Sequence, residues 1–276
     1  REDPEFAEIL SRVRVGEHTE ADIAALKALE KNDTLLDDCL SIYFTNYQAD
    51  GYNDMQLQRL VLKKTYGPLK AIDSGRDKET GRAVIKHTNV GMHEAGGLPP
   101  ELTIAEGARY MQTKNTDRED YIVNGATGII TNIAIDESKP MKGTIFVKFD
   151  DSRVGKSAKK KSKYPGSVPV KAETNPFRFK QGNETVSMER TQYPGILAWG
   201  ITAHKAQGST YHEMIGVFTR KKTDTGRLMP YQPAIAYTIL SRGTARSRMK
   251  LVDFTSDCIV VNKQALKEMK RIQQAR

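Results

Sequence analysis

The sequence predicts an α/β protein that carries a β-rich insertion. Towards both ends of the chain, short apolar runs are followed by polar turns and amphipathic helices, the order expected for an α/β sheet. In the middle, several short strand-like runs are separated by glycine-containing turns, which is typical of a small barrel. We therefore expect residues 1–100 and 191–276 to be two parts of one α/β domain, and residues 101–190 to be the inserted β subdomain.

The composition indicates a folded chain with an anionic partner. The chain has 276 residues, 38% of them apolar, a mean hydropathy of −0.56 and a formal net charge of +9. This charge favours nucleic acid as the partner. The apolar runs are shorter than the ~18 residues of a membrane-spanning helix, so we expect no membrane partner. The opening REDPEF has neither an initiator Met nor a hydrophobic signal, and we expect a segment of a longer protein.

The two cysteines, Cys39 and Cys258, lie far apart in the sequence and form no metal-ligand cluster. We expect them to be buried, reduced thiols of a nuclear or cytoplasmic protein, with a mitochondrial location left open. We expect no metal site in this chain.

The N-terminal part predicts two helices, a strand and a further helix. Phe6, Ile9, Leu10 and Val13 share one helical stripe that ends at Gly16. A capping box of Thr19 with Asp22 begins a second helix, which runs through Leu29. Residues 40–44 form a short strand that ends at Thr45 and Asn46, and the helix after it carries the apolar residues Tyr52, Met55, Leu57 and Leu60.

The middle of the chain predicts β structure with less definition. Residues 66–100 are polar and rich in glycine and proline, and they contain at most one strand, near residues 83–85. Strands are expected at 102–104, 108–111, 128–133 and 143–149, with a tight turn at Asn124-Gly125. The lysine-rich stretch 151–163 predicts a flexible basic loop that touches phosphates. A solvated loop tip is an equally good interpretation.

The rest of the chain is organised around the stretch YPGILAWGITAHKAQGST, residues 193–210. Residues 196–201 predict a buried strand, and the polar cluster that follows from Thr202 is typical of an edge that handles phosphate. Ligands of open α/β sheets bind outside the carboxyl ends of strands. The alternative is an ordinary polar turn. Beyond it we expect a strand at 215–218, a helix at 232–240, a strand at 249–254, and a final helix capped by Asn262.

Several of these stretches resemble one family. ITAHKAQGST resembles motif V of superfamily 1 DNA helicases, and AYTILSR resembles their motif VI. LPPELTIAEGARYMQTKN with IVNGATGIIT is similar to the stretch before motif V in the 5′-to-3′ branch. FTNYQADGYN and DPEFAEILSRVRVGEHTEADI are similar to early parts of the second motor domain. The most similar families are the petite-integration-frequency helicases and the helicase part of Helitron transposons.

This resemblance implies a RecA-like second motor domain with an inserted Src-homology-3-like barrel. It also implies an ATP-dependent 5′-to-3′ DNA helicase whose partners are single-stranded DNA and its junctions with duplex, with roles in DNA repair and recombination. The sequence contains no G-x-x-x-x-G-K-[ST] loop and no Asp-Glu pair that closes an apolar strand. We therefore expect ATP with Mg²⁺, whose ligands would lie on an N-terminal RecA-like domain, and no ATPase activity of this segment alone.

The resemblance assigns roles to individual residues. Arg242 is the expected arginine finger, and Gln207 and Gly208 are expected beside the nucleotide. The expected contacts to the DNA backbone are Thr45, Asn46, Thr202, His204 and Lys205. The alternatives are an arginine paired with a carboxylate, a packed histidine, and a helix cap at Thr45 or Asn46.

The sequence departs from the family at several positions, which leaves other functions open. Ala234-Ile235 stands where the family usually has Gly-Gln, and Ser209 stands where Leu or Met is common. One alternative is a non-enzymatic nucleic-acid-binding relic of a helicase. The other is the helicase part of a conjugative relaxase or of a Helitron transposase.

Overall fold

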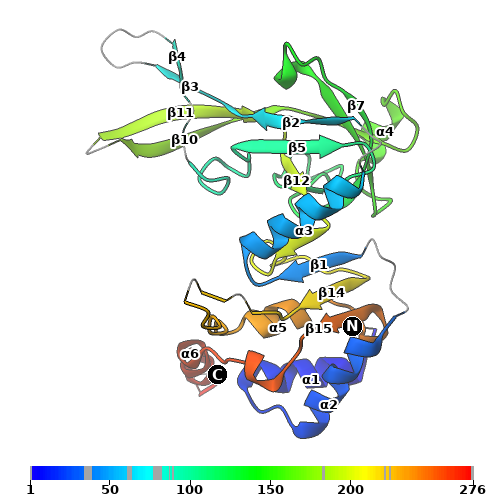
Figure 1. The fold of residues 1–276 in the computed structure, drawn as a ribbon, viewed down its shortest axis with the longest axis vertical. Helices are drawn as coiled ribbons and strands as arrows, with labels where there is room; N and C mark the ends of the chain where they lie inside the picture. The colour runs from blue at the N-terminus through cyan, green and yellow to red at the C-terminus, as the bar shows by residue number, and fades with distance from the viewer. Residues whose placement is uncertain are drawn as a thin grey trace. The chain divides into compact units, whose positions relative to one another are not determined.

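The computed structural model divides the chain into two compact units (Figure 1). It describes residues 2–33, 39–60, 64–76, 83–86, 88, 90–181, 184–220, 222–223 and 225–274. One unit comprises Arg1–Asn53 and Trp199–Arg276, and the other comprises Asp54–Ala198. The chain leaves the first unit within helix α3 (Asn46–Arg59). The β-rich unit thus takes in residues 54–100, which the sequence had placed in the α/β part. No helix of the described residues is long and apolar enough to span a membrane.

The first unit is built on a four-stranded parallel sheet. Its strand order is β13 (Gly200–Thr202), β1 (Leu40–Tyr43), β14 (Met214–Val217) and β15 (Met249–Val252). Ile42 pairs with Ile201 on one side and with Gly216 on the other. The strands are almost entirely buried, as parallel strands covered on both faces are. The helices of this unit are α1 (Pro4–Val15), α2 (Glu20–Ala28), the start of α3, α5 (Ile235–Leu240) and α6 (Lys263–Gln274).

Capping groups set the helix ends, and most were predicted. Asp3 Oδ1 accepts from the Phe6 N–H at 2.9 Å to begin α1, whose four predicted apolar residues are buried. Thr19 and Asp22 form the predicted capping box of α2. Asn262 Oδ1 accepts from the backbone at the start of α6, as expected.

Two predicted elements of the first unit have different bounds in the structure. The strand expected over residues 196–201 is two strands in two sheets. β12 (Gly195–Leu197) pairs with β6 (Arg109–Gln112) in the second unit, whereas β13 pairs with β1 in the first. The helix expected from residue 232 begins only at Ile235, because Ala234 adopts the left-handed conformation with φ 64°. The buried face of α3 differs from the one expected. It carries Ala49, Asn53 and Gln56, while the expected core residue Met55 is exposed.

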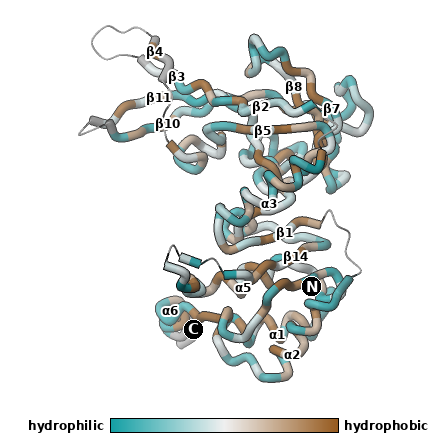
Figure 2. Tube along the Cα trace, in the orientation of Figure 1, coloured by the Kyte–Doolittle hydropathy of each residue, from teal (hydrophilic) through white to brown (hydrophobic). Residues whose placement is uncertain are grey.

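The second unit consists mainly of antiparallel sheets. A five-stranded sheet has the order β12, β6, β7 (Thr127–Ala134), β8 (Thr144–Phe149), β9 (Val168–Lys171), and the hydrophobic stretch of β8 is visible in Figure 2. It contains most strands expected between residues 102 and 149. A two-stranded ribbon pairs β2 (Thr65–Lys70) with β5 (Glu101–Ala105). The Src-homology-3-like barrel stays a prediction.

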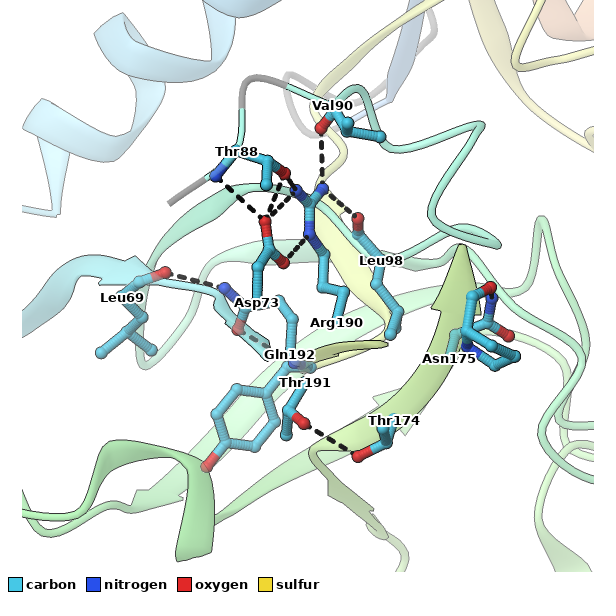
Figure 3. A network of polar contacts seen from close by, with 12 residues as sticks. Leu69, Asp73, Thr88, Val90, Leu98, Thr174, Asn175, Arg190, Thr191 and Gln192 are labelled. Carbon is cyan, nitrogen blue, oxygen red and sulfur yellow. Dashed lines mark hydrogen bonds and ion pairs between the residues drawn. The ribbon is translucent and has the colours of Figure 1, made fainter. Parts of the chain in front are cut away.

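A second sheet of this unit contains the strand that was expected near residues 83–85, but the stretch 66–100 holds more than the one strand expected there. It has the order β10 (Glu173–Gln181), β11 (Glu184–Gln192), β3 (Ile72–Arg76), β4 (Ala83–Lys86). Arg190 on β11 and Asp73 on β3 form a buried ion pair, with Nε–Oδ1 2.7 Å and Nη2–Oδ2 2.8 Å. The remaining Arg190 N–H groups reach Val90, Leu98 and Thr88, so that all five donors are used (Figure 3).

The lysine-rich stretch is partly helical, which corrects the expectation of a flexible loop. Lys156–Lys160 form the short helix α4. The Asp120 carboxylate accepts from the backbone N–H groups of Ser157 at 2.8 Å and Ala158 at 2.9 Å. Burial would raise the pKa of Asp120, but these hydrogen bonds together with other interactions outweigh it, and the pKa is lowered. The buried carboxylate therefore holds the lysines in a defined place on the surface.

Candidate nucleotide and nucleic-acid site

The polar turn after β13 is held by its own backbone and by Thr202. The Ala206 N–H donates to the Thr202 carbonyl at 3.0 Å, and the Lys205 N–H lies 3.5 Å from Thr202 Oγ1. Thr202 is only 4% exposed, so its hydroxyl serves the turn. Gly208 has φ 81°, a backbone conformation that favours glycine. His204, Gln207 and Gly208 are exposed.

The two predicted DNA-contact segments meet at the carboxyl edge of the parallel sheet. Tyr43 pairs with Thr202, and the Ala203 N–H donates to the Tyr43 carbonyl at 2.9 Å. Thr45 and Asn46 follow directly on β1. Thr45 caps α3, since its Oγ1 accepts from the Gln48 N–H at 3.3 Å, while Asn46 is exposed. The cap expected at one of these residues therefore belongs to Thr45.

Asp50 of α3 acts electrostatically on Lys205 of the turn. Lys205 is half-buried, and burial lowers its pKa, while the Asp50 carboxylate opposes this shift. An ammonium beside a carboxylate keeps its charge more readily than an isolated buried one. Asp50 was missed from the sequence, and its position one turn after Asn46 in α3 is the signal that could have found it.

Arg242 lies at the end of α5 and is bound to the turn after β13. Its Nη1 donates to the Ser209 carbonyl at 2.9 Å and its Nε to the Thr238 carbonyl at 3.0 Å. Its Nη2 donates to Ser241 Oγ at 2.8 Å. No carboxylate of the described residues forms an ion pair with Arg242. The predicted arginine finger, Arg242, therefore lies next to the turn that contains Gly208.

The backbone joins the same two segments a second time. The Tyr211 N–H donates to the Arg242 carbonyl at 2.9 Å, and Tyr211 forms a parallel bridge with Gly243. The two segments that resemble motif V and motif VI are therefore fixed to each other by the side chain and by the main chain of Arg242. The carbonyl of Ser209 was missed from the sequence, because no residue type marks a backbone acceptor.

The two cysteines are buried thiols, as predicted. The Sγ of Cys39 donates to Glu213 Oε2 at 3.7 Å. Burial raises the pKa of the Cys258 thiol to about 12. In the described ranges, no three His, Cys, Asp or Glu side chains come together as a metal site.

The chain is a mixed α/β protein, and its fold matches the RecA-like fold of solved Pif1 helicases. The crystal structure of Pif1 helicase from Candida albicans matches with a TM-score of 0.66 and 22% identity, over 98% of this chain and 58% of that one. The Bacteroides Pif1 helicase in complex with ADP-AlF3 and ssDNA matches with a TM-score of 0.64 and 20% identity, over 99% and 55%.

In sequence, no family model matches the chain. ATP-dependent DNA helicase PIF1 of Emericella nidulans is 24% identical over 94% of this chain. The homologues of the chain are Pif1-family ATP-dependent DNA helicases, and they cover most of it. The chain spans 37% of the length of the Emericella relative.

Proposed function

We propose that this chain is the second motor domain of a Pif1-like, ATP-dependent 5′-to-3′ DNA helicase. The observation that carries the proposal is the position of Arg242, whose guanidinium donates to the Ser209 carbonyl directly after the Gly208 turn. Two segments that are 33 residues apart in the sequence meet there. An arginine placed by backbone acceptors, with no carboxylate partner among the described residues, keeps its charge for a ligand.

The ligand of Arg242 is proposed to be the terminal phosphate of ATP. The three hydrogen bonds of its guanidinium leave two N–H donors for phosphate oxygens. A cation in this role stabilises the charge that spreads over the transferring phosphoryl group. Gln207 and Gly208 lie on the same exposed turn, and the missing Cβ of Gly208 lets its backbone approach a phosphate. We place the phosphate loop and the Mg²⁺ ligands on an N-terminal RecA-like domain of the same protein.

The carboxyl edge of the sheet is proposed to contact the backbone of single-stranded DNA. Asn46 follows β1, and His204 and Lys205 follow the neighbouring strand β13, so all three come from the same edge of the sheet and would donate to phosphate oxygens. Thr202 and Thr45 are proposed to position these side chains, because the Thr202 hydroxyl supports the turn and the Thr45 hydroxyl caps α3. The Bacteroides relative was crystallised with ADP-AlF3 and ssDNA, which supports the same two ligand classes here. The five-stranded sheet would be the Src-homology-3-like barrel, with the lysines of α4 near the duplex junction.

The test is Arg242→Ala in the full-length protein, with DNA-stimulated ATP hydrolysis as the measurement. Loss of a transition-state cation is expected to lower turnover by about 10³-fold or more, while DNA affinity stays within a few-fold. Arg248→Ala is the control, because Arg248 carries the same charge and pairs with Glu2 instead. Wild-type turnover in Arg242→Ala would overturn the role of Arg242. A wild-type protein that binds DNA but hydrolyses no ATP would favour the relic.

A further inference from the structure

We propose that Tyr47 is a stacking platform for a base of single-stranded nucleic acid. Its side chain is 71% exposed, the largest fraction among the exposed large hydrophobic residues that the structure describes. It lies in the first turn of α3, directly after Thr45 and Asn46. The inference deepens the proposed function, since it depends on a strand that passes along this edge of the sheet.

The first turn of α3 lies at the same sheet edge as the cationic turn. Tyr43 at the end of β1 pairs with Thr202, and its carbonyl accepts from the Ala203 N–H at 2.9 Å. The helix α3 begins at Asn46, only three residues after Tyr43, so Tyr47 lies in a helical turn that follows this pairing directly. Asp50 is on the same helix face as Tyr47, three residues further on, and acts electrostatically on Lys205 of the cationic turn.

The opposite face of α3 fixes the helix to the sheet. Asn53 is buried, its Nδ2 donates to the Gly200 carbonyl at 2.8 Å, and its Oδ1 accepts from the Gly200 N–H at 2.8 Å. Ala49 on the same face is 1% exposed. These contacts hold α3 against β13, which ends in the turn. A platform on a fixed helix loses little entropy when a base stacks on it.

The charges nearby make stacking important for affinity. Proteins that bind single strands combine a cationic path for the backbone with aromatic rings for the bases. Here the Asp50 carboxylate offsets part of the Lys205 charge, so the attraction for phosphate alone is limited. Single exposed hydrophobic residues are common on protein surfaces. The combination of an exposed ring, a cation and two exposed polar side chains at one sheet edge indicates the ligand.

The experiment compares two oligonucleotides of equal length, oligo(dT) and an abasic deoxyribose-phosphate strand. Affinities for the full-length protein are measured by fluorescence anisotropy. In Tyr47→Ala, affinity for oligo(dT) should fall about 5- to 100-fold, the range measured for removal of a base-stacking ring. Affinity for the abasic strand should change less than about twofold, because no base is there to stack. Tyr47→Phe keeps the ring and should bind oligo(dT) like the wild type.

The control is Met55→Ala, which removes another exposed apolar side chain of α3 and should leave both affinities unchanged. Thermal unfolding of Tyr47→Ala verifies its fold. Equal loss on both strands, no loss on either, or the same loss in Tyr47→Phe would overturn the stacking role. The double variant His204→Gln, Lys205→Gln separates the two hypotheses. If it weakens both strands while Tyr47→Ala weakens neither, the DNA-binding edge stands and the platform does not.

Discussion

Ala234 occupies a backbone conformation that suits glycine better than alanine. Its φ is 64° and its ψ is −4°, and its N–H donates to the Val260 carbonyl at 2.7 Å just before α5. The resemblance noted in the sequence has glycine at this position. The departure from the family pattern therefore has a local structural cost, because a Cβ in the left-handed region crowds the following carbonyl.

Replacing Ala234 with glycine should stabilise the chain. The relief of the left-handed conformation is expected to exceed the added entropy of the unfolded state, with a net gain of about 0.5–1 kcal/mol. The free energy of unfolding from denaturant titration is the measurement. Ala236→Gly is the matched control, since Ala236 is buried within α5, and it should cost about 1 kcal/mol or more. Equal destabilisation by both substitutions would contradict the interpretation.

At the scale of elements, the ion pair of Arg190 and Asp73 joins strands that lie far apart in the sequence. Both side chains are almost completely buried. Burial alone would raise the pKa of Asp73, but the hydrogen bonds from Arg190 and Thr88 outweigh it and the pKa is lowered. A lowered pKa in the folded state contributes stability above the unfolded pKa, and this contribution is lost as the pH falls through the folded value.

Arg190→Met should be strongly destabilising at neutral pH. It leaves a buried carboxylate without its cation, which typically costs about 3–5 kcal/mol. The difference from the wild type should shrink as the pH falls towards about 4, because protonation neutralises the unpaired Asp73. Denaturant titrations at both pH values measure it. Arg178→Met, on the exposed face of the same sheet, should change stability by less than about 0.5 kcal/mol. A pH-independent cost would show that the lost packing, not the charge, dominates.

The elements that the sequence predicted are those whose signals are local. The caps Thr19 and Asn262 and the stripe of α1 depend on residues within a few positions of one another, and all are present. The sheet that contains β3 was missed, because Asp73 pairs with Arg190 and nothing near either residue indicates that pairing. The division of residues 196–201 between two sheets is equally invisible, since burial in either sheet requires the same apolar residues.

The site residues also divide into those that local sequence signals indicated and those that they did not. The sequence indicated the stretches that resemble motif V and motif VI, and the structure places Arg242 against Ser209. The burial of the Thr202 hydroxyl and the exposure of Tyr47 depend on how α3 and β13 pack, which residue types alone do not determine. The sites of individual contacts to nucleotide and DNA remain predictions.

At the scale of the whole molecule, the net charge of +9 predicts salt-dependent binding to nucleic acid, but the location of the charge should matter more than its sum. Asp120 anchors α4 through a hydrogen bond from the helix backbone. Four exposed lysines lie in this helix or directly after it: Lys156, Lys160, Lys161 and Lys163. Lys27, Lys31, Lys263 and Lys267 are equally exposed in the first unit. The two sets contribute the same formal charge.

Replacing the α4 set with glutamine should reduce the salt dependence of binding to a forked DNA. Each lost phosphate contact lowers the slope of log K against log salt by about 0.9 on duplex and about 0.7 on a single strand. The same number of substitutions in the control set removes equal charge and should leave that slope nearly unchanged. Affinities of the full-length protein at several salt concentrations decide between them. Equal slopes for the two variants would mean that the α4 lysines act only through the overall charge, and that the structured basic segment has no contact of its own with DNA.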